Sequence, residues 1–287
     1  MSDDVPTADD GLSPEAAFSL LGNATRIDIL QVLAEDPTEP LSFSELRERV
    51  GEPDSGKFNY HLQQLTGQFV RRTDEGYALR LAGSLVVGAI VAGAYSRSRA
   101  LDPIPIDASC RECGGSMELR YAEEIVTLAC SDCDHVVTKF GVPPGILEGY
   151  DREELPAVID RWIWTRFGGV VDGFCMNCYG PVTPEVALHD ESDDPFLLRF
   201  VCDRCGDVVK CAVGTYLRYQ PVVAAFHAEH GIDLRTTPSW SLDWLYDDHA
   251  TVVSEDPVEI VVDVELGDDT LTVVIDEDLD IVETTRS

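Results

Sequence analysis

The chain has 287 residues, of which 53 are acidic and 21 are lysine or arginine, so its formal net charge at pH 7 is −32. A hydrophobic fraction of 44% excludes global disorder, and the length predicts two or three domains. So acidic a surface repels itself in dilute buffer and is typical of cytoplasmic proteins that work in molar salt. The N-terminal residues MSDDVPTADD contain no basic or apolar signal segment, which also favours a cytoplasmic location.

Residues 41–100 are the exception to the acidic charge. They hold 8 basic and 6 acidic side chains, whereas residues 101–287 hold 12 basic and 38 acidic ones. The difference is either a chance fluctuation or the mark of an anionic partner. A slightly basic segment in so acidic a chain favours the partner.

The pattern of the N-terminal third predicts helices. Apolar residues in 23–34 fall mostly on one helical face. Ser42 and Glu45 fit a capping box at the start of a short helix over 43–50. A second helix is expected over 55–65, with apolar residues at core spacing. Two short helices joined by a turn are typical of a helix-turn-helix.

A hairpin and a further helix follow. Strands are expected over 69–73 and 77–81, because an Asp-Glu-Gly turn separates them. The apolar run over 79–95 contains Arg80 and is short for a bilayer core. We therefore expect a packed helix over 81–99 and no membrane partner. Together with the two preceding helices, the hairpin predicts a winged helix-turn-helix.

Three stretches carry a family resemblance. The runs LGNATRIDILQVL (21–33), FNYHLQQL (58–65) and FVRR (69–72) resemble the ArsR-type winged helix-turn-helix regulators, and the resemblance covers residues 13–98. It implies a dimer on double-stranded DNA, with the second helix of the pair in the major groove and the wing on the backbone. Metal-sensing members carry cysteines in the first helix of the pair, whereas 43–50 has none, which argues against metal sensing by that route.

Polar and basic side chains off the core face of the second helix, and on the wing, are candidate DNA contacts. Asparagine and glutamine can pair with adenine, and lysine with guanine or phosphate. For any one residue, the alternative is a plain solvated helix face. His61 is instead expected to pack and hydrogen-bond within the fold. The candidate contacts are Ser55, Lys57, Asn59, Tyr60, Gln63, Gln64, Arg71, Arg72 and Arg80.

Eight of the nine cysteines form four C-x-x-C pairs in two sets. Each pair places two thiolates on one side of a tight turn, and two facing turns complete the four-sulfur shell that Zn²⁺ prefers. Disulfides, which would need an export route, and a thioredoxin-like redox pair are the alternatives. We predict two structural zinc sites. The ligands of the first are Cys110, Cys113, Cys130 and Cys133, and those of the second are Cys175, Cys178, Cys202 and Cys205.

The two cysteine sets indicate an internal duplication. Sixteen residues separate the pairs of the first set and 23 those of the second, with the excess in the acidic segment 189–195. Helices are expected after each ribbon, over 151–167 and 215–231. Core packing is favoured over a ligand cage for the aromatic residues Trp162, Trp164, Phe167 and Phe174. The ninth cysteine, Cys211, is expected to be a small buried hydrophobe, with a redox-active thiol as the alternative.

The C-terminal residues alternate between apolar and acidic. Strands over 258–266 and 271–275 predict a hairpin, and a third strand near 279–282 is an option. Fourteen acidic residues against one arginine between 246 and 287 argue against DNA contact there. A solvated acidic face is favoured over a catalytic carboxylate pair.

These features predict an α+β protein: a winged helix-turn-helix, two zinc-ribbon-plus-helix units and an acidic β-hairpin. The expected parts are a disordered acidic N-terminus (1–12), a winged helix-turn-helix domain (13–100), a first ribbon with its helix (101–170), a second ribbon with its helix (171–235) and an acidic β-rich segment (236–287). The fusion of such a domain to zinc ribbons in an acidic chain is similar to transcriptional regulators of halophilic archaea.

The expected function is therefore transcriptional regulation by a homodimer on double-stranded DNA, paired through the 81–99 helix or the C-terminal module. That module would fix the dimer, bind a small effector or contact a protein. The alternative is a zinc-ribbon assembly protein of the transcription machinery whose winged helix contacts protein. An enzyme is not expected, because no phosphate loop, Rossmann fingerprint, H-E-x-x-H or nucleophile–base set is present in the sequence.

Overall fold

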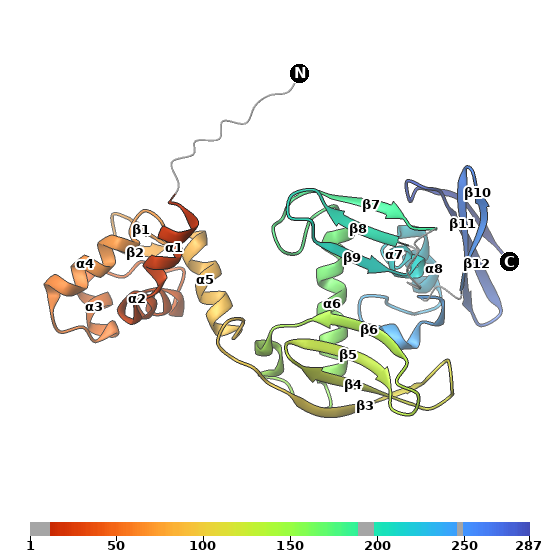
Figure 1. Cartoon of the computed structure of the whole chain (residues 1–287), viewed down its shortest axis with the longest axis horizontal. Coiled ribbons are helices and arrows are strands. Elements are labelled where there is room, and N and C mark those ends of the chain that lie inside the picture. The colour runs from red at the N-terminus through yellow and green to blue at the C-terminus, as the bar shows by residue number, and fades with distance from the viewer. Residues whose placement is uncertain (1–11, 189–197, 246–248) are drawn as a thin grey trace, which may run out of the picture. The chain divides into compact units, whose positions relative to one another are not determined.

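The computed structural model describes residues 12–188, 198–245 and 249–287, and it shows a mixed α+β fold with several antiparallel sheets (Figure 1). The chain divides into two compact units. The first comprises Met1–Arg99 with Pro143–Glu148, and the second comprises Ala100–Val142 with Gly149–Ser287. No helix of the described residues is long and apolar enough to cross a membrane.

The first unit consists of helices packed around a short hairpin. Its elements are α1 (Pro14–Leu21), α2 (Ala24–Glu35), α3 (Phe43–Val50), α4 (Ser55–Leu65), β1 (Val70–Arg72), β2 (Tyr77–Leu79), α5 (Leu81–Val91) and the 3₁₀ turn η1 (Pro144–Leu147). Fully buried side chains of α2, α3 and α4 form its core, among them Leu30, Leu46 and Leu65. The rings of Phe43 and Phe58 meet edge to face, with centroids 5.2 Å apart, and so join α3 to α4.

Side-chain caps set where α3 and α4 begin. The predicted capping box is confirmed: Ser42 Oγ accepts from the Glu45 amide at 3.3 Å, and Glu45 Oε2 accepts from the Ser42 amide at 3.0 Å. Asp54 Oδ1 accepts from the Gly56 and Lys57 amides at 2.8 and 3.0 Å. Gly51, with a φ of 75°, ends α3. Both helices therefore have the bounds predicted from the sequence.

The predicted helix over 81–99 is wrong in length, because α5 ends at Val91. Gly93 has a φ of 70° and its amide donates to the Ile90 carbonyl at 3.0 Å. A glycine in the left-handed conformation ends a helix, so the small-residue pattern beyond it does not continue as helix.

Three antiparallel sheets organise the second unit. The first has the order β3 (Leu101–Ser109), β4 (Ser116–Ala122), β5 (Ile125–Cys130) and β6 (Val136–Gly141). The second has the order β7 (Val182–Val186), β8 (Leu198–Cys202) and β9 (Val208–Cys211). The third has the order β10 (Ala250–Glu255), β11 (Val258–Leu266), β12 (Asp269–Ile275) and β13 (Ile281–Arg286). Its helices are α6 (Leu155–Val171), α7 (Val213–Leu217) and α8 (Pro221–Glu229), with 3₁₀ turns η2 (Ser239–Ser241) and η3 (Asp243–Leu245).

Several predicted elements of this unit need correction. The helix expected over 151–167 is α6, which begins at Leu155. The single helix expected over 215–231 is two helices, because Pro221 lacks an amide hydrogen and starts a new one. The C-terminal hairpin is part of a four-stranded sheet rather than an isolated pair. Its strands β11 and β12 match the predicted pair, with Val262 opposite Val273.

One core joins the second and third sheets. It takes Phe167 from α6, Leu198 from β8, Leu217 from α7, Phe226 from α8 and Ile260 from β11, all nearly or fully buried. This core crosses the boundary predicted near residue 235, because α8 and the third sheet bury their apolar faces on the same cluster.

The aromatic side chains near α6 differ in burial. Phe167 packs as predicted, at 5.8 Å from both Phe200 and Tyr219 by ring centroids. Phe174 does not, since 59% of it is exposed. It lies outside α6, at a bridge to Pro181 beside the second cysteine set.

Candidate metal centres and candidate nucleic-acid interface

The structure brings each predicted set of four cysteines together. Within each set the four Sγ atoms all lie within 4.8 Å of one another. In the first set Cys110 Sγ lies 3.8 Å from Cys133 Sγ, and Cys113 Sγ lies 3.6 Å from Cys130 Sγ. In the second set the corresponding distances are 3.7 Å (Cys175 to Cys205) and 3.5 Å (Cys178 to Cys202).

These separations fit a tetrahedral metal ion. A Zn²⁺ ion with four Zn–S bonds of about 2.3 Å requires sulfur atoms about 3.8 Å apart. A disulfide requires an Sγ–Sγ distance of about 2.05 Å, and none of the eight cluster cysteines forms a disulfide. The two clusters are therefore compatible with two metal ions, one on each set.

Each cysteine pair sits in the same backbone turn. The amide of the first cysteine donates to the carbonyl five residues later: Cys110 to Gly115, Cys130 to His135, Cys175 to Gly180 and Cys202 to Asp207. The residue after the second cysteine has a φ between 56° and 74°; these residues are Gly114, Asp134, Tyr179 and Gly206. Four repeats of one turn are the structural counterpart of the C-x-x-C spacing.

Backbone amides also point at the sulfur atoms. The Asp132 amide donates to Cys130 Sγ at 3.3 Å and is the first of several contacts, those of neighbouring cysteines included, that lower the pKa of Cys130 to about 7. The Cys205 amide donates to Cys202 Sγ at 3.5 Å and is likewise the first of several contacts that lower the pKa of Cys202 to about 6. Amide donors favour thiolate over thiol, which is the form that binds a metal ion.

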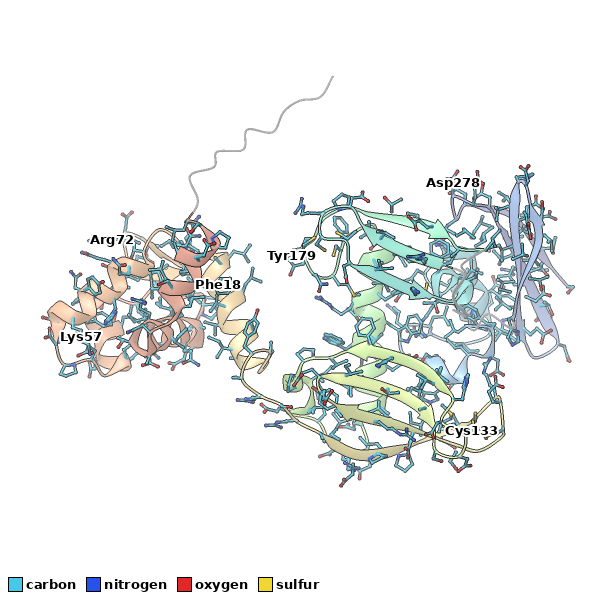
Figure 2. The ribbon with its side chains drawn as sticks, in the orientation of Figure 1. Phe18, Lys57, Arg72, Cys133, Tyr179 and Asp278 are labelled. Carbon is cyan, nitrogen blue, oxygen red and sulfur yellow. The ribbon has the colours of Figure 1, made fainter. Side chains whose placement is uncertain are left out.

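The clusters lie at the ends of their sheets. In the first cluster Cys110 follows β3 and Cys130 ends β5, and both are buried. Cys133, in the turn between β5 and β6, is exposed (Figure 2). The acidic segment 189–195 lies outside the described residues. Cys211 is buried in the core of the second unit, as expected, and is part of neither cluster.

The predicted DNA contacts on α4 share its solvent side. Ser55, Lys57, Tyr60, Gln63 and Gln64 are exposed, whereas Phe58, Leu62 and Leu65 are buried. Asn59 is half-buried. The polar face predicted from the sequence is therefore present as one surface of α4.

His61 lies on the inner side of α4. Only 8% of it is exposed, so the prediction that it packs is confirmed. The expected hydrogen bond is not found at Nδ1, which has no partner among the described residues. Burial lowers its pKa, so the ring is neutral at pH 7.

The hairpin β1–β2 carries the predicted wing arginines. Arg71 and Arg72 of β1 are exposed, and the Arg72 guanidinium lies 6.0 Å from the Tyr77 ring (Figure 2). A bridge between Leu41 and Tyr77 fixes the hairpin to the segment before α3. The hairpin that carries Arg71 and Arg72 is thus anchored at its base through β2.

Two of the predicted cations are already engaged within the fold. Lys57 Nζ lies 2.6 Å from Glu52 Oε2, and this contact raises the pKa of Lys57. Arg80 Nη1 donates to the Gly67 carbonyl. The sequence did not indicate either contact, because the residues are 5 and 13 positions apart and cross a turn or the hairpin. Arg71 and Arg72 are thus the more accessible cations of the set.

Two family models match the chain. Residues 107–281 match a family described as a domain of unknown function (DUF7351). The chain belongs to the DUF7351 family. Its first unit matches a second model over residues 14–90, also described as a domain of unknown function (DUF7347). No curated protein and no solved structure matches the chain. The DUF7351 match contains both cysteine clusters, and the DUF7347 match contains α4 and the hairpin.

Proposed function

We propose that this DUF7351 protein is a cytoplasmic, sequence-specific DNA-binding transcriptional regulator whose first unit is a winged helix-turn-helix. One observation carries the proposal: the exposed polar face of α4 precedes a hairpin with two exposed arginines, and both lie within residues 41–100, which hold 8 basic and 6 acidic side chains in an otherwise acidic chain. In this interpretation, α3 and α4 are the two helices of the helix-turn-helix, and the β1–β2 hairpin is the wing.

The charge pattern limits where DNA can bind. Residues 101–287 hold 38 acidic and 12 basic side chains, so a phosphate backbone is repelled there. On the first unit, Asn59, Gln63 and Gln64 can bond base edges, and Arg71 and Arg72 can bond phosphates. Recognition by base edges suits high salt, because counterion release supplies little affinity there.

We propose that both cysteine clusters hold structural Zn²⁺. Four thiolates complete a tetrahedral shell and leave no position for a reactive water, so the ions would stabilise the ribbons and not catalyse. A single iron ion fits the same four-sulfur shell. Metal analysis of the purified protein distinguishes zinc from iron.

A homodimer is the proposed assembly, formed through the first unit. The exposed fractions of its large apolar side chains are 72% for Phe18 of α1 and 76%, 53% and 61% for Leu81, Leu85 and Val91 of α5. Leu81 and Leu85 are four residues apart and share one side of α5. A second copy of the chain would cover these side chains, which are exposed among the described residues of the first unit.

The DNA proposal is tested by selecting bound duplexes from a random pool, at a salt concentration that keeps the protein folded. We expect one sequence motif to be enriched, with two half-sites if the protein is dimeric. Fluorescence anisotropy then compares the selected duplex with a scrambled one. Arg71→Ala and Arg72→Ala should weaken binding to both duplexes alike, because phosphate contacts carry no sequence information.

Lys139→Ala is the matched control, because Lys139 is an exposed cation on β6 of the second unit. It should leave DNA binding unchanged. If no motif is enriched, and the three cation variants behave like the wild type, the winged helix contacts protein instead. The chain would then be an assembly protein of the transcription machinery.

A further inference from the structure

The outer side of α4 carries side-chain amides that the fold itself does not use. On a helix with 3.6 residues per turn, Tyr60 and Gln63 lie opposite the buried side, and Asn59 and Gln64 flank them. Tyr60 is 56% exposed, and Gln63 and Gln64 are exposed as well. The three amides make no hydrogen bond with any of the described residues. They are therefore available to a partner.

The cation of α4 is held within the fold. Lys57 is the only lysine or arginine in the sequence of this helix, and its Nζ lies 2.6 Å from Glu52 Oε2. The Glu52 side chain is only 11% exposed, and its Oε1 accepts from the Asp54 amide at 3.2 Å, so the carboxylate is fixed beside Lys57. To bond guanine, Lys57 would have to leave this carboxylate.

Carboxylates also occupy the N-terminal end of α4. Asp54 Oδ1 accepts from the Gly56 and Lys57 amides at 2.8 and 3.0 Å, so these amides are not open to a phosphate. Glu52 and Asp54 outnumber the single ammonium of Lys57 there. Guanine presents two acceptors, O6 and N7, in the major groove, and a phosphate is an anion. Neither would find a surplus of positive charge at this end of the helix.

An A·T pair matches the groups that α4 does offer. Adenine presents an acceptor, N7, beside a donor, the N6 amino group, and a side-chain amide has a donor and an acceptor, so the two can form a bidentate pair. Facing guanine, the amide oxygen would meet a second acceptor. The thymine of an A·T pair adds a methyl group on the major-groove edge. Tyr60, three residues before Gln63, supplies an exposed ring for it, and this ring meets the His61 ring edge to face with centroids 5.4 Å apart.

We infer that α4 reads A·T pairs. Gln63 donates to adenine N7 and accepts from adenine N6, and the Tyr60 ring contacts a thymine methyl group. Asn59 and Gln64 extend the preference to the neighbouring base pairs. The ammonium of α4 remains in its ion pair and selects no guanine. The inference rests on the proposed DNA binding and adds to it the kind of base pair that each half-site presents to α4.

The test uses the duplex selected from the random pool and two modified versions of it. In one, a single adenine is replaced by 7-deazaadenine, which pairs with thymine but lacks the N7 acceptor. In the other, a single thymine is replaced by uracil, which lacks the methyl group. Each adenine and thymine of the half-site is replaced in turn, and affinity is measured by fluorescence anisotropy at a salt concentration that keeps the protein folded.

We expect one sensitive adenine and one sensitive thymine in each half-site. At that adenine, 7-deazaadenine should weaken wild-type binding by about tenfold, because part of a bidentate pair is lost. At that thymine, uracil should weaken it by about fourfold, because one buried methyl group is lost.

Variants identify the side chain that reads each base. Gln63→Ala should bind the selected duplex about tenfold more weakly and show no further loss with 7-deazaadenine, because both changes remove the same bond. Tyr60→Ala should likewise be insensitive to uracil. Gln64→Ala is the matched control, since it removes an equally exposed amide of the same helix and should keep both losses at these two positions. Circular dichroism confirms that each variant folds.

The outcomes separate this inference from the DNA-binding proposal. If the pool yields no motif, DNA binding itself is contradicted and the inference falls with it. A motif made of G·C pairs alone, or wild-type binding that tolerates both modified bases at every position, would leave DNA binding standing and overturn the inference. The inference would also be overturned if 7-deazaadenine still weakened binding by Gln63→Ala at the sensitive adenine, because another residue would then read that base.

Discussion

The two units of the molecule form their local structure in different ways. In the first unit, apolar periodicity defines the helices, and the side chains of Ser42 and Asp54 set where they begin. In the second unit, short strands end at four copies of one cysteine turn, where backbone amides point at sulfur. If the clusters hold metal ions as proposed, the more acidic unit relies on a local device that a metal ion completes. The first unit needs only its core.

The largest expected effect is that metal removal unfolds part of the second unit and leaves the first unit folded. Chelation at neutral pH should release about two Zn²⁺ per chain and unfold the first ribbon, because a small ribbon buries too little surface to fold alone. The second ribbon should lose its cysteine turns but keep β8, which packs into the core that joins the second and third sheets. Hydrogen exchange should show lost protection in β4 and β5, and retained protection in α2, α4 and β8. Less than one metal ion per chain with all strands protected would refute the four-thiolate assignment.

Single cysteine variants sharpen this comparison. Cys130→Ser should lower the metal content from two ions to one, since a buried ligand of the first cluster is lost. Cys211→Ala is the matched control, because Cys211 is equally buried but belongs to neither cluster. It should keep both ions, and a loss of metal in this variant would contradict the ligand sets.

Salt should also affect the two units unequally. Residues 101–287 hold 38 acidic and 12 basic side chains, whereas 41–100 are nearly balanced. Screening of self-repulsion should raise the melting temperature of the second unit by on the order of 10 °C between dilute and molar KCl, and that of the first unit by much less. Calorimetry checks this. A melting curve that does not change with salt would show that the charge has no energetic consequence.

The sequence was most informative where spacing alone fixes geometry. The capping box and the bounds of α3 and α4 follow from local chemistry, and the C-x-x-C pairs predicted which thiols meet. Positions decided by tertiary context were missed. β3 contains Pro103 and Pro105, which argue against a strand, but it lies at the edge of its sheet, where prolines are tolerated.

The candidate sites show the same division. The polar face of α4 could be predicted from helical periodicity. The pairing of Lys57 with Glu52 could not, because it depends on how the turn before α4 folds. A cavity beside Trp164 was also missed, because its lining residues are far apart in sequence: Arg161 lies on α6, Arg218 follows α7 and Arg235 follows α8.

A smaller effect is expected at α4, the helix that we propose contacts DNA. Asn59→Ala should weaken binding to the selected duplex by about 1–3 kcal/mol and leave binding to a scrambled duplex unchanged, because a base contact is lost. The binding of both duplexes by Gln64→Ala can be compared with that by Asn59→Ala, because Gln64 is an exposed residue of the same helix, α4. Anisotropy on both duplexes measures the effect. An equal loss on both would reassign Asn59, which is half-buried, to a packing role.

The smallest expected effect is a pH dependence that arises from His230 in the second unit. His230 Nδ1 lies 2.8 Å from the Phe226 carbonyl and Nε2 lies 2.9 Å from Asp269 Oδ2, so both nitrogens face acceptors. The Phe226 carbonyl first, and then Asp269 and Glu229, raise its pKa above the ordinary 6.5. The imidazolium therefore stabilises the fold fully below pH 6.5, and this stabilisation is lost as pH rises through the raised pKa.

His227 gives the opposite sign and serves as the internal control. It is fully buried, accepts from Trp244 Nε1 at 3.1 Å and has its pKa lowered by burial. The neutral His227 ring therefore stabilises the fold above pH 6.5, and this stabilisation is lost only as pH falls through the lowered pKa. Denaturant titrations between pH 5 and 8.5 should therefore show that the free energy of unfolding falls as pH rises above 6.5. The variant His230→Gln should lack this decrease. If the decrease persists in the variant, another group causes it. Protonation of His230 beside Asp269 would then not stabilise the fold.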